Sequence, residues 1–139
     1  MASTLKINTL TGVTTAGSIA VTGEGNSTTT NLQQGLAKAF AMADMDGDDA
    51  IEDSLNFASV VDNGSGDFEL NFTNNMSSAS YAKSGNCGNK TKGTASVPVC
   101  RPAISTSSAY KFTTVFASST SEGAFDADDI NSSIHGDLA

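Results

Sequence analysis

Residues 53–72 read DSLNFASVVDNGSGDFELNF, and this stretch decides the fold class. Apolar and polar residues alternate from Phe68 to Phe72, which is the pattern of a β-strand with one buried face. A second apolar segment, Leu55–Val61, precedes it, and the turn between them contains Asn63-Gly64, a pair that readily adopts positive φ. The stretch therefore predicts an antiparallel hairpin that pairs Leu55–Val61 with Phe68–Phe72.

Further strand signals lie on the C-terminal side of the hairpin. Tyr110–Phe116 reads as a strong strand. Ala95–Cys100 reads as extended, and Pro98 restricts it to the edge or end of a sheet because proline donates no ladder hydrogen bond. Tyr81 begins or ends a third strand. The Gly-, Asn- and Lys-rich residues 82–94 predict a surface loop.

The C-terminal residues 123–139 are acidic and contain few apolar side chains. Asp128 and Asp129 belong to a predicted solvated acidic run. Four apolar side chains are the candidates to anchor this tail: Phe125, Ile130, Ile134 and Leu138.

The composition supports the same fold class. Ser and Thr together fill 35 of 139 positions, with 11 Asn and 13 Gly, whereas charged residues are only 16%. These residue types suit short strands joined by tight turns, and 38% hydrophobic residues with two prolines do not fit disorder. We predict a mostly β protein, a short-stranded sandwich or prism-like domain that carries an N-terminal arm with one short helix.

The N-terminal part differs from the rest and predicts this arm. Thr4–Leu10 and Ser18–Thr22 read as short strands, and Thr30 and Gln33 have the spacing of a capping box, which starts a helix. Apolar residues then recur at helical spacing, so we predict an amphipathic helix over Asn31–Met42. A helix this short needs a partner for its apolar face.

Leu32, Leu36 and Phe40 form the apolar face of the predicted helix. We predict that they are buried together, against the β domain or against other copies of the chain, and that they serve assembly. The chain thus divides into an attachment and oligomerisation arm, residues 1–42, and a β-rich outer domain, residues 43–139.

The charge balance restricts the partners. The chain has 15 acidic and 7 basic residues, so its formal net charge is -8. This charge repels phosphate backbones and anionic membrane surfaces. No run of about 18 apolar residues is present for membrane insertion, and the first seven residues lack the apolar segment of a secretory signal. We therefore expect no nucleic acid, no membrane insertion and assembly in a cytoplasm.

Asp44, Asp46 and Asp48 are the candidate metal ligands, because calcium prefers oxygen ligands at alternating positions. The register differs from that of an EF-hand. With Asp44 in the first position, Asp49 occupies the place of the glycine and Leu55 the place of the bidentate Glu. We interpret the segment as an acidic turn that leads into a strand, and predict no metal site.

Cys87 and Cys100 leave two alternatives open. A disulfide between them would clip a loop and stabilise the fold by on the order of 3 kcal/mol in the chain-entropy model. A reducing cytoplasm instead favours free thiols. Two cysteines without a Cys-x-x-Cys motif or a nearby histidine do not predict a zinc site.

No residue pattern predicts catalysis. His135 is the only histidine, and a triad with Asp137 can be imagined only because serines are abundant. A Gly-x-Ser-x-Gly elbow is absent. A glycosidase needs two placed carboxylates in a cleft that aromatic side chains usually line, and this chain has no Trp and two Tyr. We predict a non-enzymatic protein with no catalytic residues and no cofactor.

Three stretches carry a resemblance to a known group of proteins: TLKINTLTGVTTAGSIAVTGEGNSTTTNLQQGLAKAF at 4–40, DSLNFASVVDNGSGDFELNFTNNMSSASY at 53–81 and HGDLA at 135–139. They resemble small virion proteins and tail-fibre end modules of marine tailed phages that infect cyanobacteria and pelagic α-proteobacteria. The resemblance covers nearly the whole chain and is weakest over 83–108. It implies a structural role, commonly as a trimeric fibre, spike or surface-exposed appendage, and it carries over no catalytic residue.

We therefore expect a structural protein of the virion, first of all a tail-fibre or tail-appendage component that docks through its N-terminal arm. Its outer domain would be a spacer or would contact the host surface. A capsid decoration protein or head fibre is the alternative, and a polysaccharide-degrading spike is a third hypothesis. The expected partners are further copies of the chain in a homotrimer, other tail or capsid proteins and a receptor on the host surface.

Overall fold

The chain divides into two compact units, Met1–Leu36 and Ala37–Ala139. The structure is a computed structural model that describes residues 4–12, 19–22, 29–88, 97–117 and 122–139. The predicted boundary after residue 42 falls inside a strand of the second unit. Each unit is described separately below.

The first unit contains two short strands and one turn of helix. β1 (Ala20–Thr22) and β2 (Thr29–Asn31) pair antiparallel, and α1 (Leu32–Gly35) follows at once. The predicted strand Thr4–Leu10 is wrong, since the structure assigns no strand to residues 4–12. Alternation alone does not make a strand without a neighbour, and the pairing in this unit joins β1 to β2.

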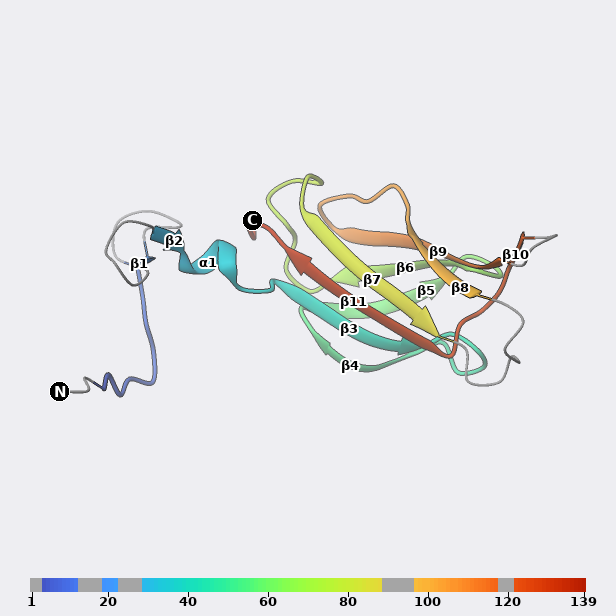
Figure 1. The fold of residues 1–139 in the computed structure, drawn as a ribbon, viewed down its shortest axis with the longest axis horizontal. Coiled ribbons are helices and arrows are strands. Elements are labelled where there is room, and N and C mark those ends of the chain that lie inside the picture. Colours follow the sequence, from blue (N-terminus) through green and yellow to red (C-terminus); the bar gives the residue numbers. More distant parts are fainter. Residues whose placement is uncertain (1–3, 13–18, 23–28, 89–96, 118–121) are drawn as a thin grey trace. The chain divides into compact units, whose positions relative to one another are not determined.

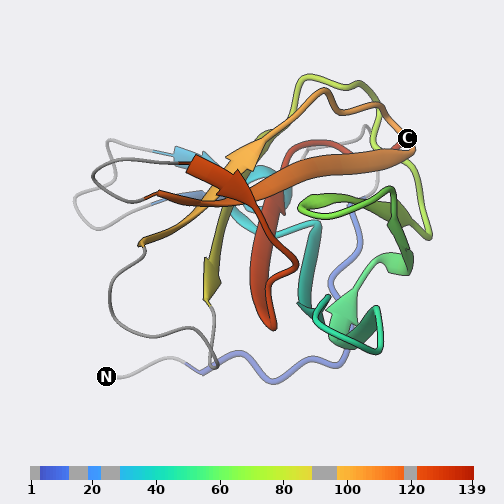
Figure 2. The ribbon, with the colours of Figure 1, turned by 90° about the vertical axis from the view of Figure 1, so that its right-hand side faces the viewer.

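The second unit is a sandwich of two antiparallel sheets (Figures 1 and 2). Its strands are β3 (Ala39–Asp44), β4 (Ala50–Leu55), β5 (Phe57–Asp62), β6 (Asp67–Phe72), β7 (Ala82–Gly88), β8 (Val97–Pro102), β9 (Ala109–Ala117), β10 (Glu122–Ala124) and β11 (Asp129–His135). One sheet has the order β4-β3-β11-β7 and the other the order β10-β9-β6-β5, with β8 also paired to β9. The β10 end faces the viewer in Figure 2. The predicted mostly β fold class is confirmed.

The core joins large side chains on one sheet to small ones on the other. β6 and β9 direct a layer of aromatic rings inward, with Phe68 and Phe112 5.7 Å apart and Tyr110 and Phe112 5.4 Å apart between ring centroids. From the opposite sheet, β3 contributes only alanine at its buried positions, and β11 adds two isoleucines. Ten buried apolar residues of these four strands belong to one cluster: Ala39, Ala41, Ala43, Phe68, Leu70, Phe72, Tyr110, Phe112, Ile130 and Ile134.

The predicted hairpin is confirmed in its second strand and in its pairing. Val60 of β5 lies opposite Leu70 of β6, and all three apolar side chains of β6 are buried on one face. The turn uses positive φ at Gly64 and at Gly66, and the Asp67 N–H donates to the Gly64 carbonyl over 2.8 Å.

The first strand of the hairpin is shorter than predicted, because the chain changes sheet at Asn56. β4 ends at Leu55 and belongs to one sheet, whereas β5 begins at Phe57 and belongs to the other. Asn56 has φ of 60°, a left-handed conformation that asparagine tolerates better than most residues. Its Oδ1 accepts from the Asn74 N–H over 2.7 Å, and its Nδ2 donates to the Asn74 carbonyl over 3.0 Å. The corner divides the predicted strand Leu55–Val61 between the two sheets.

The predicted helix over Asn31–Met42 is wrong beyond its first turn. α1 ends at Gly35, and β3 begins at Ala39. Leu32, Leu36 and Phe40 match a helical spacing, but the alanines at alternate positions of β3 fill the shallow space that the opposing rings leave. Tertiary packing therefore overrides the helix propensity of alanine.

Two predictions about polar segments are also wrong. The acidic run is not solvated throughout, because Asp128 is buried and the run leads into β11, which lies between β3 and β7. Of the four candidate anchors, Phe125, Ile130 and Ile134 are confirmed as buried, whereas Leu138 is exposed. The predicted loop 82–94 contains the strand β7, and its remaining residues, from 89 on, lie outside the described ones. Both strands were missed because Ser, Asn and Gly occupy four of the seven positions of β7 and three of the seven positions of β11.

The alanine positions of β3 generate a stability prediction. Ala41 is buried, and its neighbour Met42 is exposed on the other face of the same strand. Because the core has no room for added methylenes, Ala41→Leu should lower the free energy of unfolding by about 1–3 kcal/mol. Met42→Leu, the matched control, should change it by less than about 0.5 kcal/mol. Urea denaturation measures both, and equal effects would contradict the packing described here.

Candidate functional site

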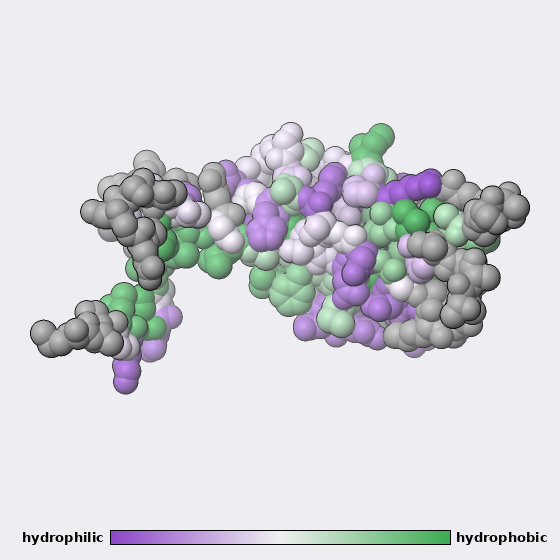
Figure 3. Space-filling view, in the orientation of Figure 1, coloured by the Kyte–Doolittle hydropathy of each residue, from purple (hydrophilic) through white to green (hydrophobic). Residues whose placement is uncertain are grey.

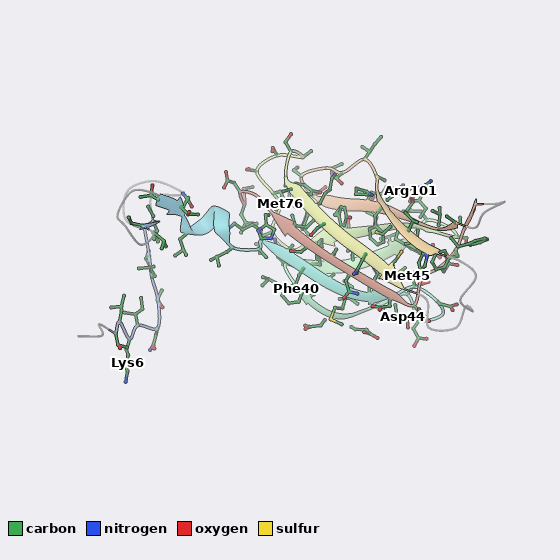
Figure 4. The ribbon with its side chains drawn as sticks, viewed as in Figure 1. Lys6, Phe40, Asp44, Met45, Met76 and Arg101 are labelled. Carbon is green, nitrogen blue, oxygen red and sulfur yellow. The ribbon has the colours of Figure 1, made fainter. Side chains whose placement is uncertain are left out.

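The three candidate metal ligands lie in the turn that joins β3 to β4. Figure 4 labels Asp44 at the end of β3. Its Oδ1 accepts from the Asp46 N–H over 2.9 Å, so this carboxylate closes the turn, and Asp46 and Asp48 are exposed. Among the described residues, no group of three or more His, Cys, Asp or Glu side chains is placed to hold a metal ion. The geometry is that of an acidic turn.

This geometry predicts how Asp44 substitutions behave. Asp44→Ala removes the acceptor for the Asp46 N–H and should cost about 1 kcal/mol of unfolding free energy. Asp44→Asn keeps a side-chain carbonyl acceptor and should be close to neutral. Excess calcium should leave the thermal midpoint of the wild-type protein unchanged. If calcium instead raised the thermal midpoint of the wild-type protein but not that of Asp44→Asn, the turn would be a metal site.

A shallow groove of about 480 Å³ lies on the outer face of the four-stranded sheet, over β3, β11 and β7. Two rows of cross-strand partners supply its outward side chains: Phe40, Ser133 and Ser84, and Met42, Asn131 and Asn86. None of the residues that line it is charged. The groove thus offers amides, hydroxyls and two apolar side chains, which suit a neutral polar ligand better than an ion.

Apolar side chains are also exposed where the beginning of β3 lies beside the end of β4. Phe40 lies opposite Leu55, and these side chains are 36% and 48% exposed. Figure 4 labels Phe40, and Figure 3 shows an apolar area over the same part of the sheet. Together with Met42 they form what is called the β3–β4 patch below. The sequence analysis selected Phe40 as part of a helix face, whereas Phe40 lies in a strand. Only the strand register reveals Leu55 as its neighbour.

The first unit exposes apolar side chains along most of its described length (Figure 3). Leu5 is 78% exposed. The other exposed large apolar residues of this unit are Ile7, Leu10, Val21 and Leu36. The predicted assembly residues therefore do not share one helix: Leu32 lies in α1, Leu36 directly after it and Phe40 in β3.

His135, which was considered above for a triad with Asp137, is the last residue of β11. His135 Nε2 lies 3.4 Å from Ser133 Oγ, and these residues share a face of β11 simply because they are two positions apart. Ser133 lines the groove, but neither a carboxylate nor the imidazole does. The groove therefore holds no acid–base pair.

Cys87 and Cys100 are both free thiols and both partly buried against the core. Interaction with the Cys87 thiol lowers the pKa of Cys100, against the opposing effect of burial. Interaction with Cys100, reinforced by burial, raises the pKa of Cys87 well above its usual value. Their spacing in the sequence did not predict that they meet.

In the described part of the chain, no helix has the length and apolarity that crossing a bilayer requires. Comparison of the chain with protein-family models, with curated proteins and with solved structures finds no match.

Proposed function

We propose that this chain is a structural, non-enzymatic protein of a tailed bacteriophage particle, a tail-fibre or tail-appendage component that docks through its N-terminal unit. The exposed apolar side chains of that unit are the observation that carries the proposal. Each fully buried Leu or Ile side chain contributes about 1.5–3 kcal/mol. A unit that leaves Leu5, Ile7 and Leu10 in water gains this free energy only by binding another surface.

Further copies of the chain are the first partners proposed for these surfaces. The second unit has its own core and does not need the first for burial. The β3–β4 patch adds apolar area that one copy leaves exposed. A closed homotrimer would give each copy two neighbours and would cover both surfaces without leaving an open end. The threefold symmetry itself comes from the phage proteins that the sequence resembles.

The outer β domain is proposed to face away from the particle. The uncharged groove over β11 and β7 suits contact with a neutral polar group of the host surface, such as a sugar, through Asn86 and Asn131. The net charge of -8 disfavours packaged nucleic acid as a partner. A capsid decoration protein or head fibre is the alternative, since the same apolar unit would also bind a shell. Copy number separates the two, because a head protein repeats with the shell symmetry.

Particle incorporation tests the proposal. Ile7→Asp places a carboxylate in the proposed contact surface, where burial without a partner is costly. In phage that supply only this variant, the amount of the protein in purified particles, measured by mass spectrometry, should fall at least roughly ten-fold, since about 1.4 kcal/mol already corresponds to that factor.

Ile104→Asp is the matched control, because Ile104 is 87% exposed on the second unit. This variant should enter particles like the wild type. Equal incorporation of both variants would contradict docking through the first unit. Absence of the wild-type protein from purified particles would contradict the virion assignment itself.

A further inference from the structure

The two sheets of the sandwich meet along two lateral sides, and on one of them a single residue links an edge strand of one sheet to an edge strand of the other. There, β4 and β5 are the edge strands, and Asn56 carries the backbone directly from one sheet to the other. The opposite side brings together β7, the edge of the four-stranded sheet, and β8, which pairs with β9 in the other sheet. Figure 1 shows β7 and β8 close together.

Both cysteines lie on this second side and face the interior. Cys87 of β7 is the cross-strand partner of Ile130, which is buried, and Cys100 of β8 is the partner of Thr114, which is also buried. Cross-strand partners share a face of their sheet. The two thiols therefore approach each other from opposite sheets, and both pack against the core.

A glycine makes room for this approach. Gly85 lies two residues before Cys87 on β7 and so shares its face. A Cβ built on Gly85 would lie 3.8 Å from Cys100 Sγ and 3.5 Å from the Tyr110 hydroxyl oxygen. The Cys100 thiol thus lies directly against β7, without a larger side chain of that strand between them.

We propose that Cys87 and Cys100 form an intramolecular disulfide that joins the two sheets when the protein meets a low-molecular-weight disulfide such as oxidised glutathione. The Cys100 thiolate attacks one sulfur of the oxidant, forms a mixed disulfide and releases one glutathione thiolate. The Cys87 thiol then loses its proton and attacks Cys100 Sγ, and the second glutathione leaves. Two protein thiols are oxidised, and one oxidant molecule is reduced to two thiols.

The cross-link would join the two sheets on the side opposite the Asn56 corner. It restricts the unfolded chain and holds an edge strand of one sheet to the other sheet. The proposed disulfide follows from the fold alone. Only the stage at which it forms rests on the proposed function, because a particle that is assembled in a reducing cytoplasm meets oxidants after lysis.

The test uses the full-length wild-type protein, first reduced and then incubated in its native state with oxidised glutathione. The intact mass should fall by two hydrogen atoms without added glutathione, both thiols should become unreactive, and peptide mapping should link residue 87 to residue 100. The thermal midpoint should rise by on the order of 10 °C and return when a reductant is added. In a glutathione redox buffer, the equilibrium constant for forming the cross-link should be roughly a hundred-fold larger in the native protein than in the protein unfolded by denaturant.

Cys87→Ser and Cys100→Ser are the control variants, and neither should show a rise of the thermal midpoint on oxidation. Because the main comparison is made within the wild-type protein, a variant that folds poorly does not affect it. Stable mixed disulfides with glutathione, cross-links between chains only, or retention of both thiols would each overturn the proposal. None of these outcomes bears on particle incorporation, so the proposed function is tested separately.

Discussion

The rings of Phe68, Tyr110 and Phe112 occupy most of the space between the two sheets, so the facing strand β3 can be apolar only if its inward side chains are small. Protein interiors are packed to the density of organic crystals, and added volume on one side must be offset on the other. β3 meets this requirement with alanine at each buried position. The same constraint fixes which face of β3 is turned outward, and therefore places Phe40 and Met42 in the groove and in the β3–β4 patch.

The corner at Asn56 is the second element on which the sandwich depends. It turns one apolar segment into two strands of different sheets, and the reciprocal hydrogen bonds with Asn74 satisfy the side chain there. On the opposite side, where β7 and β8 come together, the two thiols face each other across the sheets. The two sheets thus meet at a backbone corner on one side and at a pair of reactive side chains on the other.

Where alternation and turn chemistry agreed, sequence reasoning predicted the structure. The hairpin of β5 and β6 and the strands β8 and β9 were expected, because β-branched and aromatic residues alternate there and a glycine marks the turn. β3 was mistaken for helix, since alanine favours helices and its role depends on the opposing sheet. β11 was not predicted as a strand, although its two isoleucines were expected to anchor the tail, because Ser132 takes the inward position between them.

The candidate site was predictable only in part. Exposed apolar residues in the N-terminal unit were expected to serve assembly, although a helix was expected to present them. The groove and the pairing of Phe40 with Leu55 depend on strand register, which the sequence pattern of β3 did not reveal. The meeting of Cys87 and Cys100 depends on how two sheets pack, and no local pattern encodes that contact.

A cryo-electron microscopy map of the purified particle tests the central proposal most directly. The account predicts threefold density on the tail that fits three copies of the sandwich, each with residues 1–36 buried against other virion proteins or against the other copies. Density at the symmetry axes of the head would instead favour the decoration or head-fibre alternative. Particles in which the sandwich is absent, or in which residues 1–36 face solvent, would contradict the account.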